Sequence, residues 1–400
     1  VCGGFHAAAD VYQYPHLLAA LSFEPMIPHS RPCLDDSDAA AVLKILGSGR
    51  LVQGEAVTAL EAAFARLPVP QETTPSDREP ANNGPSFRAA AVSSGTTALQ
   101  LTLLALGVGK GDEVIIPSYA CAALWHAVCA AGATPVLADC TEDTYNISAA
   151  DAKKRLTERT RAVIAPHLFG QAADLDALLA LGVPVIEDCA QSLGSTYRNR
   201  PTGGFGVAAV FSFYATKVIA AGEGGMVVSR DERLIARIRD LRDYDEKDDL
   251  SLRFNAKLTD LQAALALSQL GKLPAFIARR RTIAARYDRV WTQLASPAAR
   301  RRDDRDHIFF RYVVLAAAAE KLMAAMGKRG VVCRRPVFRP LHHYLGLPGF
   351  ATTEKIWQHA VSIPLYPGLT EEEIVTVETA LAESGREILG GPADGEVKPG

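Results

Sequence analysis

The feature that most constrains the fold of this 400-residue chain is an alternation of short apolar runs with helical segments. From Arg88 onward the apolar runs are continuous and do not alternate with polar residues. Strands of that kind are buried on both faces, which is typical of a mostly parallel sheet covered by helices. The pattern predicts strands at Ala89–Val92, Glu113–Ile116, Thr134–Ala138, Thr160–Ala165, Val183–Ile186, Val207–Phe213 and Gly225–Val228.

Helical periodicity separates these strands and also precedes them. A segment rich in Pro, Asn and Thr, Pro68–Pro85, is predicted to be a loop insertion. We therefore expect an α/β fold with a seven-stranded, mostly parallel sheet. The predicted helices are Asp36–Leu46, Ala56–Leu67, Thr97–Leu106, Ala120–Ala131, Asp174–Leu181 and Asp231–Tyr244.

A second, smaller region is expected toward the C-terminus. The strand-like segments His307–Leu315 and Val331–Arg334, with a helix from Thr370 to about Ser384, predict an α+β domain. The arginines between positions 279 and 289 are interpreted as a solvated helix face. The predicted organisation is an N-terminal extension (1–30), a large α/β domain (31–275), a small C-terminal α+β domain (276–390) and a flexible tail (391–400).

The charge balance argues against nucleic acid and membrane partners. Lys and Arg total 43 and Asp and Glu total 45, so the formal net charge is −2, and no polybasic block dominates. The apolar stretch Tyr119–Ala138 is about as long as a membrane span, but Gly132 and Pro135 interrupt it. A buried helix followed by a strand explains this stretch better.

The cysteines and histidines predict neither disulfides nor a metal site. The seven cysteines are odd in number and lack a C-x-x-C pair, which favours reduced thiols in a cytoplasmic protein. The nine histidines include no H-E-x-x-H motif. The adjacent residues His342 and His343 are expected to point to opposite sides of the backbone. We therefore expect no metal ion.

Two local patterns suggest a ligand-binding site. The turn Ser93–Thr97 follows a predicted strand and begins a helix, so its free N–H groups favour a bound phosphate, although plain N-capping by Ser and Thr also explains it. Asp188 ends an apolar strand at the edge where α/β sheets bind ligands. A helix cap or a buried structural role remains open for this residue.

The most specific pattern surrounds Lys217, which ends the motif S-F-Y-A-T-K and precedes G-E-G-G. A lysine in a tight loop of small residues is suited to imine formation with an aldehyde cofactor, although most lysines are simply solvated. Lys217 follows Asp188 by roughly 30 residues, the length of one strand–helix–strand unit, so both can face one crevice. A phosphate cup, a carboxylate and a reactive lysine are the groups that pyridoxal phosphate requires.

These motifs resemble those of the DegT/DnrJ/EryC1/StrS family, the sugar aminotransferases of fold type I. The resemblance covers nearly all of the chain beyond the first 26 residues, and S-F-x-x-x-K with G-E-G-G is highly specific. It implies an aspartate aminotransferase-like large domain, a small C-terminal domain and the cofactor pyridoxal 5'-phosphate. The other matching segments are Ile27–Pro32, Gly49–Gly54, Ser93–Leu99, Asp112–Tyr119, His167–Asp174, Ile186–Gly194, Phe254–Ala264 and Ser362–Leu369.

The resemblance also implies roles for individual residues. Lys217 would be the Schiff-base lysine, and Asp188 would bind the pyridine nitrogen of the cofactor. Asn255 would reach the phosphate in the neighbouring subunit of a homodimer, and His342 would lie at the substrate mouth. The implied cofactor-binding residues are Gly95, Thr96, Cys121, Asp188, Gln191, Ser212, Lys217 and Asn255.

Two residues depart from the family pattern. Cys121 stands where an aromatic side chain often stacks on the cofactor ring, so either Tyr119 compensates or the ring is held less tightly. Lys257 stands where an arginine is common, which removes bidentate recognition of an anion.

The implied function is transfer of an amino group from glutamate, a small-molecule donor, to a keto sugar linked to a nucleotide. Because position 217 is a lysine and not a histidine, the branch of the family that dehydrates sugars is disfavoured. Two alternatives stay open. One is a non-catalytic regulatory or accessory protein that binds the cofactor, and the other is an enzyme of an aminocyclitol or aromatic-amine pathway.

Overall fold

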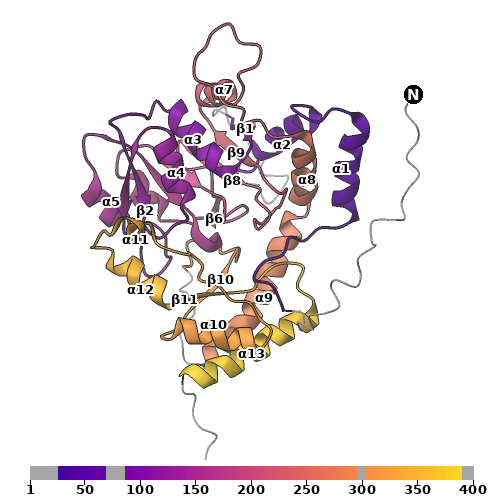
Figure 1. Ribbon diagram of the computed structural model, residues 1–400, viewed down its shortest axis with the longest axis vertical. Coiled ribbons are helices and arrows are strands. Elements are labelled where there is room, and N and C mark those ends of the chain that lie inside the picture. The colour runs from indigo at the N-terminus through magenta and orange to yellow at the C-terminus, as the bar shows by residue number, and fades with distance from the viewer. Residues whose placement is uncertain (1–25, 69–85, 295–301, 390–400) are drawn as a thin grey trace, which may run out of the picture.

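The computed structural model describes residues 26–68, 86–294 and 302–389. Most of the predicted N-terminal extension, nearly all of the predicted loop insertion and the predicted flexible tail lie outside these described residues. Figure 1 shows a large α/β unit in indigo to pink and, below it, a smaller unit in orange to yellow.

A seven-stranded sheet forms the centre of the large unit. Its order is β1-β9-β8-β5-β4-β2-β3, and within this sheet only β9 runs antiparallel to its neighbours. The prediction of a mostly parallel seven-stranded sheet is therefore confirmed. The strands are β1 (Arg88–Val92), β2 (Glu113–Pro117), β3 (Thr134–Ala138), β4 (Thr160–Pro166), β5 (Val185–Asp188), β8 (Ala208–Ser212) and β9 (Gly225–Ser229).

Helices cover both faces of this sheet, as continuously apolar strands require. Successive side chains of a strand point to opposite faces, so Ala90 and Ala91 of β1 pack with different helices. The helices on the side of Ala90 are α3 (Gly95–Ala105), α4 (Ala123–Ala130) and α7 (Glu232–Leu241). Those on the side of Ala91 are α2 (Glu55–Phe64) and α8 (Asp260–Gly271), with α5 (Ala149–Arg155) and α6 (Leu175–Leu179) farther along the sheet.

A buried carboxylate joins α8 to α2. Asp260 accepts the N–H groups of Gly54 at 2.6 Å, Ala56 at 3.0 Å and Val57 at 3.2 Å. These donors at the start of α2 have no partner within their own helix, and a negative charge at a helix N-terminus is favourable. The helix α1 (Asp36–Ser48) packs along α8 and completes this layer.

The helix α9 (Leu273–Gln293) leads from the large unit into the smaller one. It follows α8 directly at an angle of 58°. Within the described residues no single helix is long and apolar enough to cross a membrane, and only the bent pair α8 and α9 meets that length and composition together.

The smaller unit combines a two-stranded antiparallel sheet with helices, as predicted for an α+β region. Its core contains Tyr287 and Trp291 of α9, both fully buried. The segment Val331–Arg334 is not a regular strand, because it forms only isolated bridges. The elements are β10 (Tyr312–Leu315), β11 (Ala360–Ile363), α10 (Ala319–Lys328), α11 (Leu341–Leu345), α12 (Ala351–His359) and α13 (Glu371–Leu389).

The described part of the N-terminal extension packs with the smaller unit. Ile27 bridges to Val331 and lies in the apolar cluster of that unit. The predicted boundary between residues 275 and 276 falls inside α9. The residue ranges of the two domains stay a prediction.

The expectation of a solvated arginine face on α9 is wrong for Arg280. This residue is buried, and its Nη1 donates to the carbonyl oxygens of Phe309 at 3.2 Å, Phe310 at 3.3 Å and Leu365 at 3.0 Å. Burial lowers the pKa of Arg280 to about 9, and the charge of Arg311 lowers it as well. These contacts fasten α9 to the segment that carries Arg311.

Candidate active site

The ends of two neighbouring strands place predicted site residues at one edge of the sheet. Asp188 is the last residue of β5, and Ser212 is the last residue of β8, its parallel neighbour. The loop that follows β8 carries Lys217, whose backbone N–H donates to the carbonyl of Tyr214 at 2.8 Å. Because parallel strands end at the same edge, their terminal side chains and the loops that follow lie together there. We call this edge, where α/β sheets bind ligands, the cleft.

Lys217 is half-buried in this cleft, close to aromatic and charged side chains. Its Nζ lies 5.5 Å from the centre of the Phe310 ring. Burial lowers the pKa of Lys217 and Arg311 adds to this, whereas Cys121 and Asp188 act in the opposite direction. A lowered pKa increases the fraction of neutral amine, which is the form that attacks an aldehyde. Among the described residues, no hydrogen-bond or ion-pair partner holds this amine.

Asp188 is buried, with 8% of its surface exposed. Its Oδ1 accepts the N–H of Ala190 at 3.0 Å, while Oδ2 has no donor among the described residues. Burial raises the pKa of Asp188, and the Ala190 N–H and the charge of Lys217 counteract this. A buried carboxylate with one open oxygen is suited to bind a cationic N–H group of a ligand.

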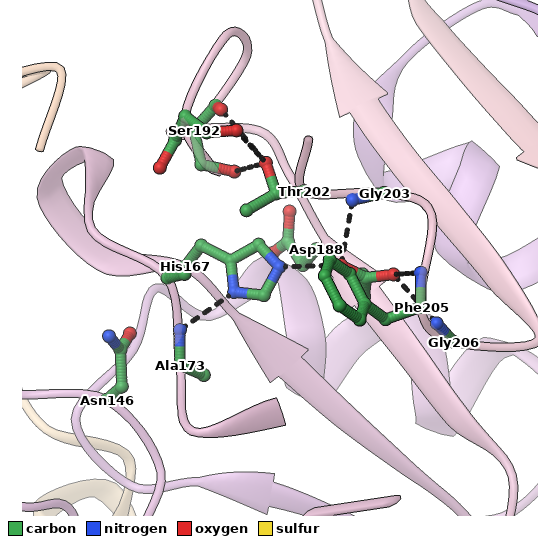
Figure 2. A network of polar contacts seen from close by, with 12 residues as sticks. Asn146, His167, Ala173, Asp188, Ser192, Thr202, Gly203, Phe205 and Gly206 are labelled. Atoms are coloured by element: carbon green, nitrogen blue, oxygen red, sulfur yellow. Dashed lines mark hydrogen bonds and ion pairs between the residues drawn. The ribbon is translucent and has the colours of Figure 1, made fainter. Parts of the chain in front are cut away.

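A buried network holds the strand end that carries Asp188 (Figure 2). Its centre is Glu187, which precedes Asp188 in β5 and is fully buried. Burial raises the pKa of Glu187, but hydrogen bonds outweigh this effect, and the net pKa lies below the usual value. Glu187 accepts hydrogen bonds from His167 Nε2 at 3.1 Å and from the backbone N–H groups of Gly203 at 2.8 Å, Phe205 at 2.7 Å and Gly206 at 2.8 Å.

His167 links Glu187 to its neighbours. Its Nδ1 accepts the N–H of Ala173 at 3.1 Å, so the ring proton lies on Nε2 and points at Glu187. The backbone N–H of His167 donates to the carbonyl of Asp188 at 3.1 Å. The ionised Glu187 and its partners therefore fix the end of β5 from which Asp188 faces the cleft.

The first turn of α3 leaves backbone donors unpaired beside β8. Ser94 caps the helix by accepting the N–H of Thr97 at 3.1 Å, but the N–H groups of Gly95 and Thr96 have no partner among the described residues. Gly95 lies against Ser212, because a Cβ added at Gly95 would come within 2.8 Å of the Ser212 Cβ. The three predicted phosphate-binding residues are thus together, and free donors at a helix N-terminus suit a phosphate.

Gln191 lies beside a strained turn at the edge of the cleft. Its Oε1 accepts the N–H of Phe169 at 2.8 Å, and Phe169 has a φ of 60°, which residues other than glycine rarely adopt. Asn146 holds the same turn by accepting the N–H of Leu168 at 2.7 Å. Because Oε1 is occupied, the Nε2 amide of Gln191 remains available to donate to a ligand.

Cys121 and Tyr119 differ in how exposed they are. Tyr119 is fully buried and meets Phe169 edge-on at 6.4 Å. Cys121 is exposed, yet the atoms around its thiol desolvate it enough to raise its pKa. Asp188 raises that pKa further, and Lys217 lowers it. Whether Tyr119 compensates or Cys121 contacts the cofactor ring stays a prediction.

Asn255 and Lys257 lie on the segment that precedes α8. Asn255 is exposed, and the carbonyl of the next residue accepts a backbone N–H from the turn before α3. Lys257 is paired with Asp243 at 2.5 Å and Asp245 at 2.9 Å, so its charge is neutralised within the chain. The predicted role of Asn255 in a neighbouring subunit stays a prediction.

The described contacts of His342 are with residues other than those around Lys217. It is buried, its ring stacks on Phe350 at 4.7 Å, and its Nδ1 is hydrogen-bonded to Ser118 Oγ at 2.7 Å. Burial lowers the pKa of His342, and the neighbouring His343 lowers it as well. Its predicted role at the substrate mouth stays a prediction.

The expectation that His342 and His343 point to opposite sides is wrong. Their ring centres lie 4.5 Å apart, and their Nε2 atoms are 3.6 and 2.6 Å from the same oxygen of Glu354. The spacing of these three residues, like that of His167, Glu187 and Cys189, is compatible with a metal ion. The expected absence of a metal stays a prediction.

The sequence pattern did not identify three residues of the cleft, His29, Phe310 and Arg311. The guanidinium carbon of Arg311 lies 4.9 Å from the centre of the Phe310 ring that Lys217 also faces, and Nη1 is 3.2 Å from His29 Nδ1. Burial lowers the pKa of Arg311 to about 10. The sequence did offer a signal for Phe310 and Arg311, because an arginine follows two phenylalanines in the apolar run 307–315.

Comparison with known proteins identifies the family. The model of the DegT/DnrJ/EryC1/StrS aminotransferase family matches residues 82–382. The chain belongs to this family. GDP-perosamine synthase from Caulobacter vibrioides is 34% identical over 314 residues, which are 73% of this chain and 84% of that protein.

Solved structures of similar proteins share the fold over most of the chain. DesV from S. venezuelae has a TM-score of 0.80 and 32% identity, covering 90% of this chain and 99% of DesV. The aminotransferase TlmJ from Streptoalloteichus hindustanus has a TM-score of 0.82 and 28% identity, covering 92% of this chain and 100% of TlmJ.

Aminotransferases of this family depend on pyridoxal phosphate, so this chain is an enzyme of that class. The residues in the cleft fit the cofactor. The free donors of Gly95 and Thr96 suit its phosphate, the open oxygen of Asp188 suits its ring nitrogen, and the amine of Lys217 suits its aldehyde. The roles of the individual residues stay predictions.

We predict that Glu187→Gln lowers the free energy of unfolding by about 1–3 kcal/mol at pH 7, because the new amide N–H₂ faces backbone donors. Denaturant titration measures this difference. The stabilisation by the Glu187 carboxylate is present above the ordinary pKa of 4.5 and is lost as pH falls through its lowered folded pKa. The difference in the free energy of unfolding between the parent and Glu187→Gln should therefore become smaller at acidic pH. Glu158→Gln at an exposed site is the control, and equal stability of the parent and Glu187→Gln would contradict the network.

Proposed function

We propose that this aminotransferase moves an amino group from glutamate to the keto carbon of a nucleotide-linked sugar, as a step in amino-sugar biosynthesis. One observation carries the proposal. Lys217 and Asp188 keep unpaired polar atoms in one cleft, beside the free N–H groups that begin α3. The resemblance to GDP-perosamine synthase supports an acceptor that is a sugar linked to a nucleoside diphosphate.

The residues of the cleft have complementary roles. The cofactor, when bound, supplies an aldehyde that exchanges amines and a ring that accepts electrons. Asp188 Oδ2 would keep a proton on the ring nitrogen, and Gln191 Nε2 would donate to the phenolic oxygen. Gly95, Thr96 and Ser212 would hold the phosphate. Cys121 would offer its polarizable sulfur to the ring.

Lys217 both holds the cofactor and moves a proton. With the cofactor bound, the Nζ of Lys217 would hold its aldehyde group and, as a free amine, would accept the proton from the donor's α-carbon. Burial lowers the pKa of Lys217, which favours the neutral amine that this step needs. The same group serves in the opposite direction when the amine is delivered to the keto sugar.

The two alternatives predict different behaviour. A non-catalytic accessory protein would not need the combination of Lys217, Asp188 and Gln191 that the cleft retains. An aminocyclitol or aromatic-amine enzyme would use the same residues and would differ only in its acceptor. A panel of keto acceptors tested with glutamate separates these cases.

We also propose that the enzyme is a homodimer and is located in the cytoplasm. The dimer is supported by the exposed side chain of Asn255 on a segment that, by family resemblance, crosses an interface. The cytoplasmic location is supported by the cysteines, because all six within the described residues are free thiols.

The first test asks whether Lys217 carries the cofactor and transfers nitrogen. Borohydride reduction of the resting holoenzyme should place the pyridoxyl label on Lys217, and glutamate should be converted to 2-oxoglutarate in a single turnover. Lys217→Arg should lower that rate by at least about a thousandfold, whereas Lys110→Arg at an exposed site should leave it unchanged. Label on another lysine, or no transfer from glutamate in reconstituted enzyme, refutes the proposal.

The second test asks whether the site is shared between subunits. Lys217→Ala and Asn255→Ala are each expected to be inactive alone. In a mixed dimer one of the two sites contains both native residues, so mixing should restore activity if Asn255 serves the opposite chain. Activity that does not return, although native mass spectrometry shows subunit exchange, rules out the shared site.

A further inference from the structure

Two histidines of α11 and a glutamate of α12 meet where these helices lie beside the large unit (Figure 1). The Nε2 atoms of His342 and His343 are 3.6 and 2.6 Å from the same oxygen of Glu354. Imidazole nitrogens and carboxylate oxygens are ligands of zinc and similar divalent ions. The three ligand atoms lie within 4.8 Å of one another, so one ion can bridge them after small side-chain movements.

A groove of about 450 Å³ opens beside these three side chains. We name it the His342 groove. Its lining includes His342, His343 and Glu354, together with Leu347 and Phe350. An ion held by the three side chains can therefore take water or an external group from the groove as a further ligand.

His342 presents a nitrogen without a hydrogen bond at this place. Its side chain is only 7% exposed, and its Nε2 is 3.6 Å from Glu354, which is too long for a hydrogen bond. Among the described residues this nitrogen has no other partner. Buried polar atoms are normally paired, so an unpaired nitrogen in the wall of a groove is suited to bind an ion.

Neighbouring side chains orient the ligands. The ring of His342 stacks on Phe350 with the ring centres 4.7 Å apart, and its Nδ1 is 2.7 Å from Ser118 Oγ. A hydroxyl oxygen can accept a proton from Nδ1, which leaves Nε2 free to bind an ion. Glu354 Oε1 accepts the side-chain amide of Gln358 at 2.6 Å, and this contact holds Oε2 toward both histidines.

The large unit also fixes the backbone that carries these ligands. Ser118, which follows β2, accepts the backbone N–H of His342 at 3.1 Å through its hydroxyl. Asp139, which follows β3, accepts the N–H groups of Thr352 at 3.0 Å and Thr353 at 2.8 Å in the first turn of α12. Ligands that are already held in place lose less conformational freedom on binding, which favours affinity.

The group formed by His167, Glu187 and Cys189 has a similar spacing but is less suited to an ion. Glu187 already accepts four hydrogen bonds, and both ring nitrogens of His167 are hydrogen-bonded (Figure 2). All three residues are buried, so an ion would have to break this network. The group at the His342 groove carries no such cost.

We propose that His342, His343 and Glu354 bind one divalent transition-metal ion, for which Zn²⁺ is a suitable candidate. Two imidazoles and one carboxylate oxygen supply three ligands, and the remaining position faces the His342 groove. The ion joins α11 to α12 and strengthens the contact of both helices with the large unit. The proposal departs from the sequence-based expectation of no metal, because these ligands come from two helices and form no short motif.

Zinc binding to the chelator-treated holoenzyme tests the proposal. Calorimetry with zinc chloride should show one ion per chain, and the melting temperature should rise with zinc concentration. His343→Gln and Glu354→Gln should each weaken zinc binding about tenfold or more, because each removes one of three ligands. His126→Gln and Glu158→Gln, both at exposed positions, are the matched controls and should keep the affinity of the parent.

The zinc X-ray absorption spectrum of the parent gives a second measurement that needs no variant. It should show nitrogen and oxygen ligands, with two imidazoles for each ion. A holoenzyme that binds no zinc, or a spectrum with sulfur ligands, overturns the proposal. Zinc affinity that is unchanged in both His343→Gln and Glu354→Gln overturns it as well, because the ion would then be bound elsewhere on the chain.

Discussion

The fully buried carboxylate of Glu187 is the interaction on which the active site depends. Three backbone N–H groups and His167 surround it, so the carboxylate stays ionised although it is removed from water. These contacts tie the loop 203–206 and the turn after β4 to the end of β5. Because adjacent strand residues face opposite sides, fixing Glu187 in this way aims Asp188 at the cleft.

The cleft itself shows the opposite arrangement, with polar atoms left unpaired. The second oxygen of Asp188, the amine of Lys217 and two N–H groups of α3 have no partner among the described residues. Buried or half-buried polar groups are normally hydrogen-bonded, so a set of open ones at one place indicates that a ligand completes them. Glycine at position 95 is required there, because a Cβ would collide with Ser212.

Much of the fold could be predicted because each strand is marked by residues that are neighbours in the sequence. The seven strands are continuous apolar runs, and each predicted run overlaps an observed strand. The turn Ser93–Thr97, Asp188 and Lys217 stand out for the same reason, since each ends or follows such a run. The antiparallel direction of β9 between β1 and β8 could not be predicted, because an apolar run in the sequence does not show which way its strand runs.

What could not be predicted depends on contacts between distant segments. Arg280 looks like a surface arginine, and only the folded chain brings three carbonyl oxygens to its guanidinium. His29 and Arg311 are far apart in sequence and meet beside Lys217. His342 and His343 both lie close to Glu354 of α12, a contact that their adjacent positions in the sequence do not reveal.

The protonation of the cofactor's ring nitrogen tests the central claim most directly. The enzyme is reconstituted with pyridoxal phosphate labelled with ¹⁵N at that position, and the nitrogen NMR shift is measured at neutral pH. The shift should be that of a protonated pyridine in the parent and should move to the unprotonated range in Asp188→Asn. An unprotonated nitrogen in the parent, or an unchanged protonated signal in Asp188→Asn, would contradict the role of the carboxylate that Glu187 and His167 hold in place.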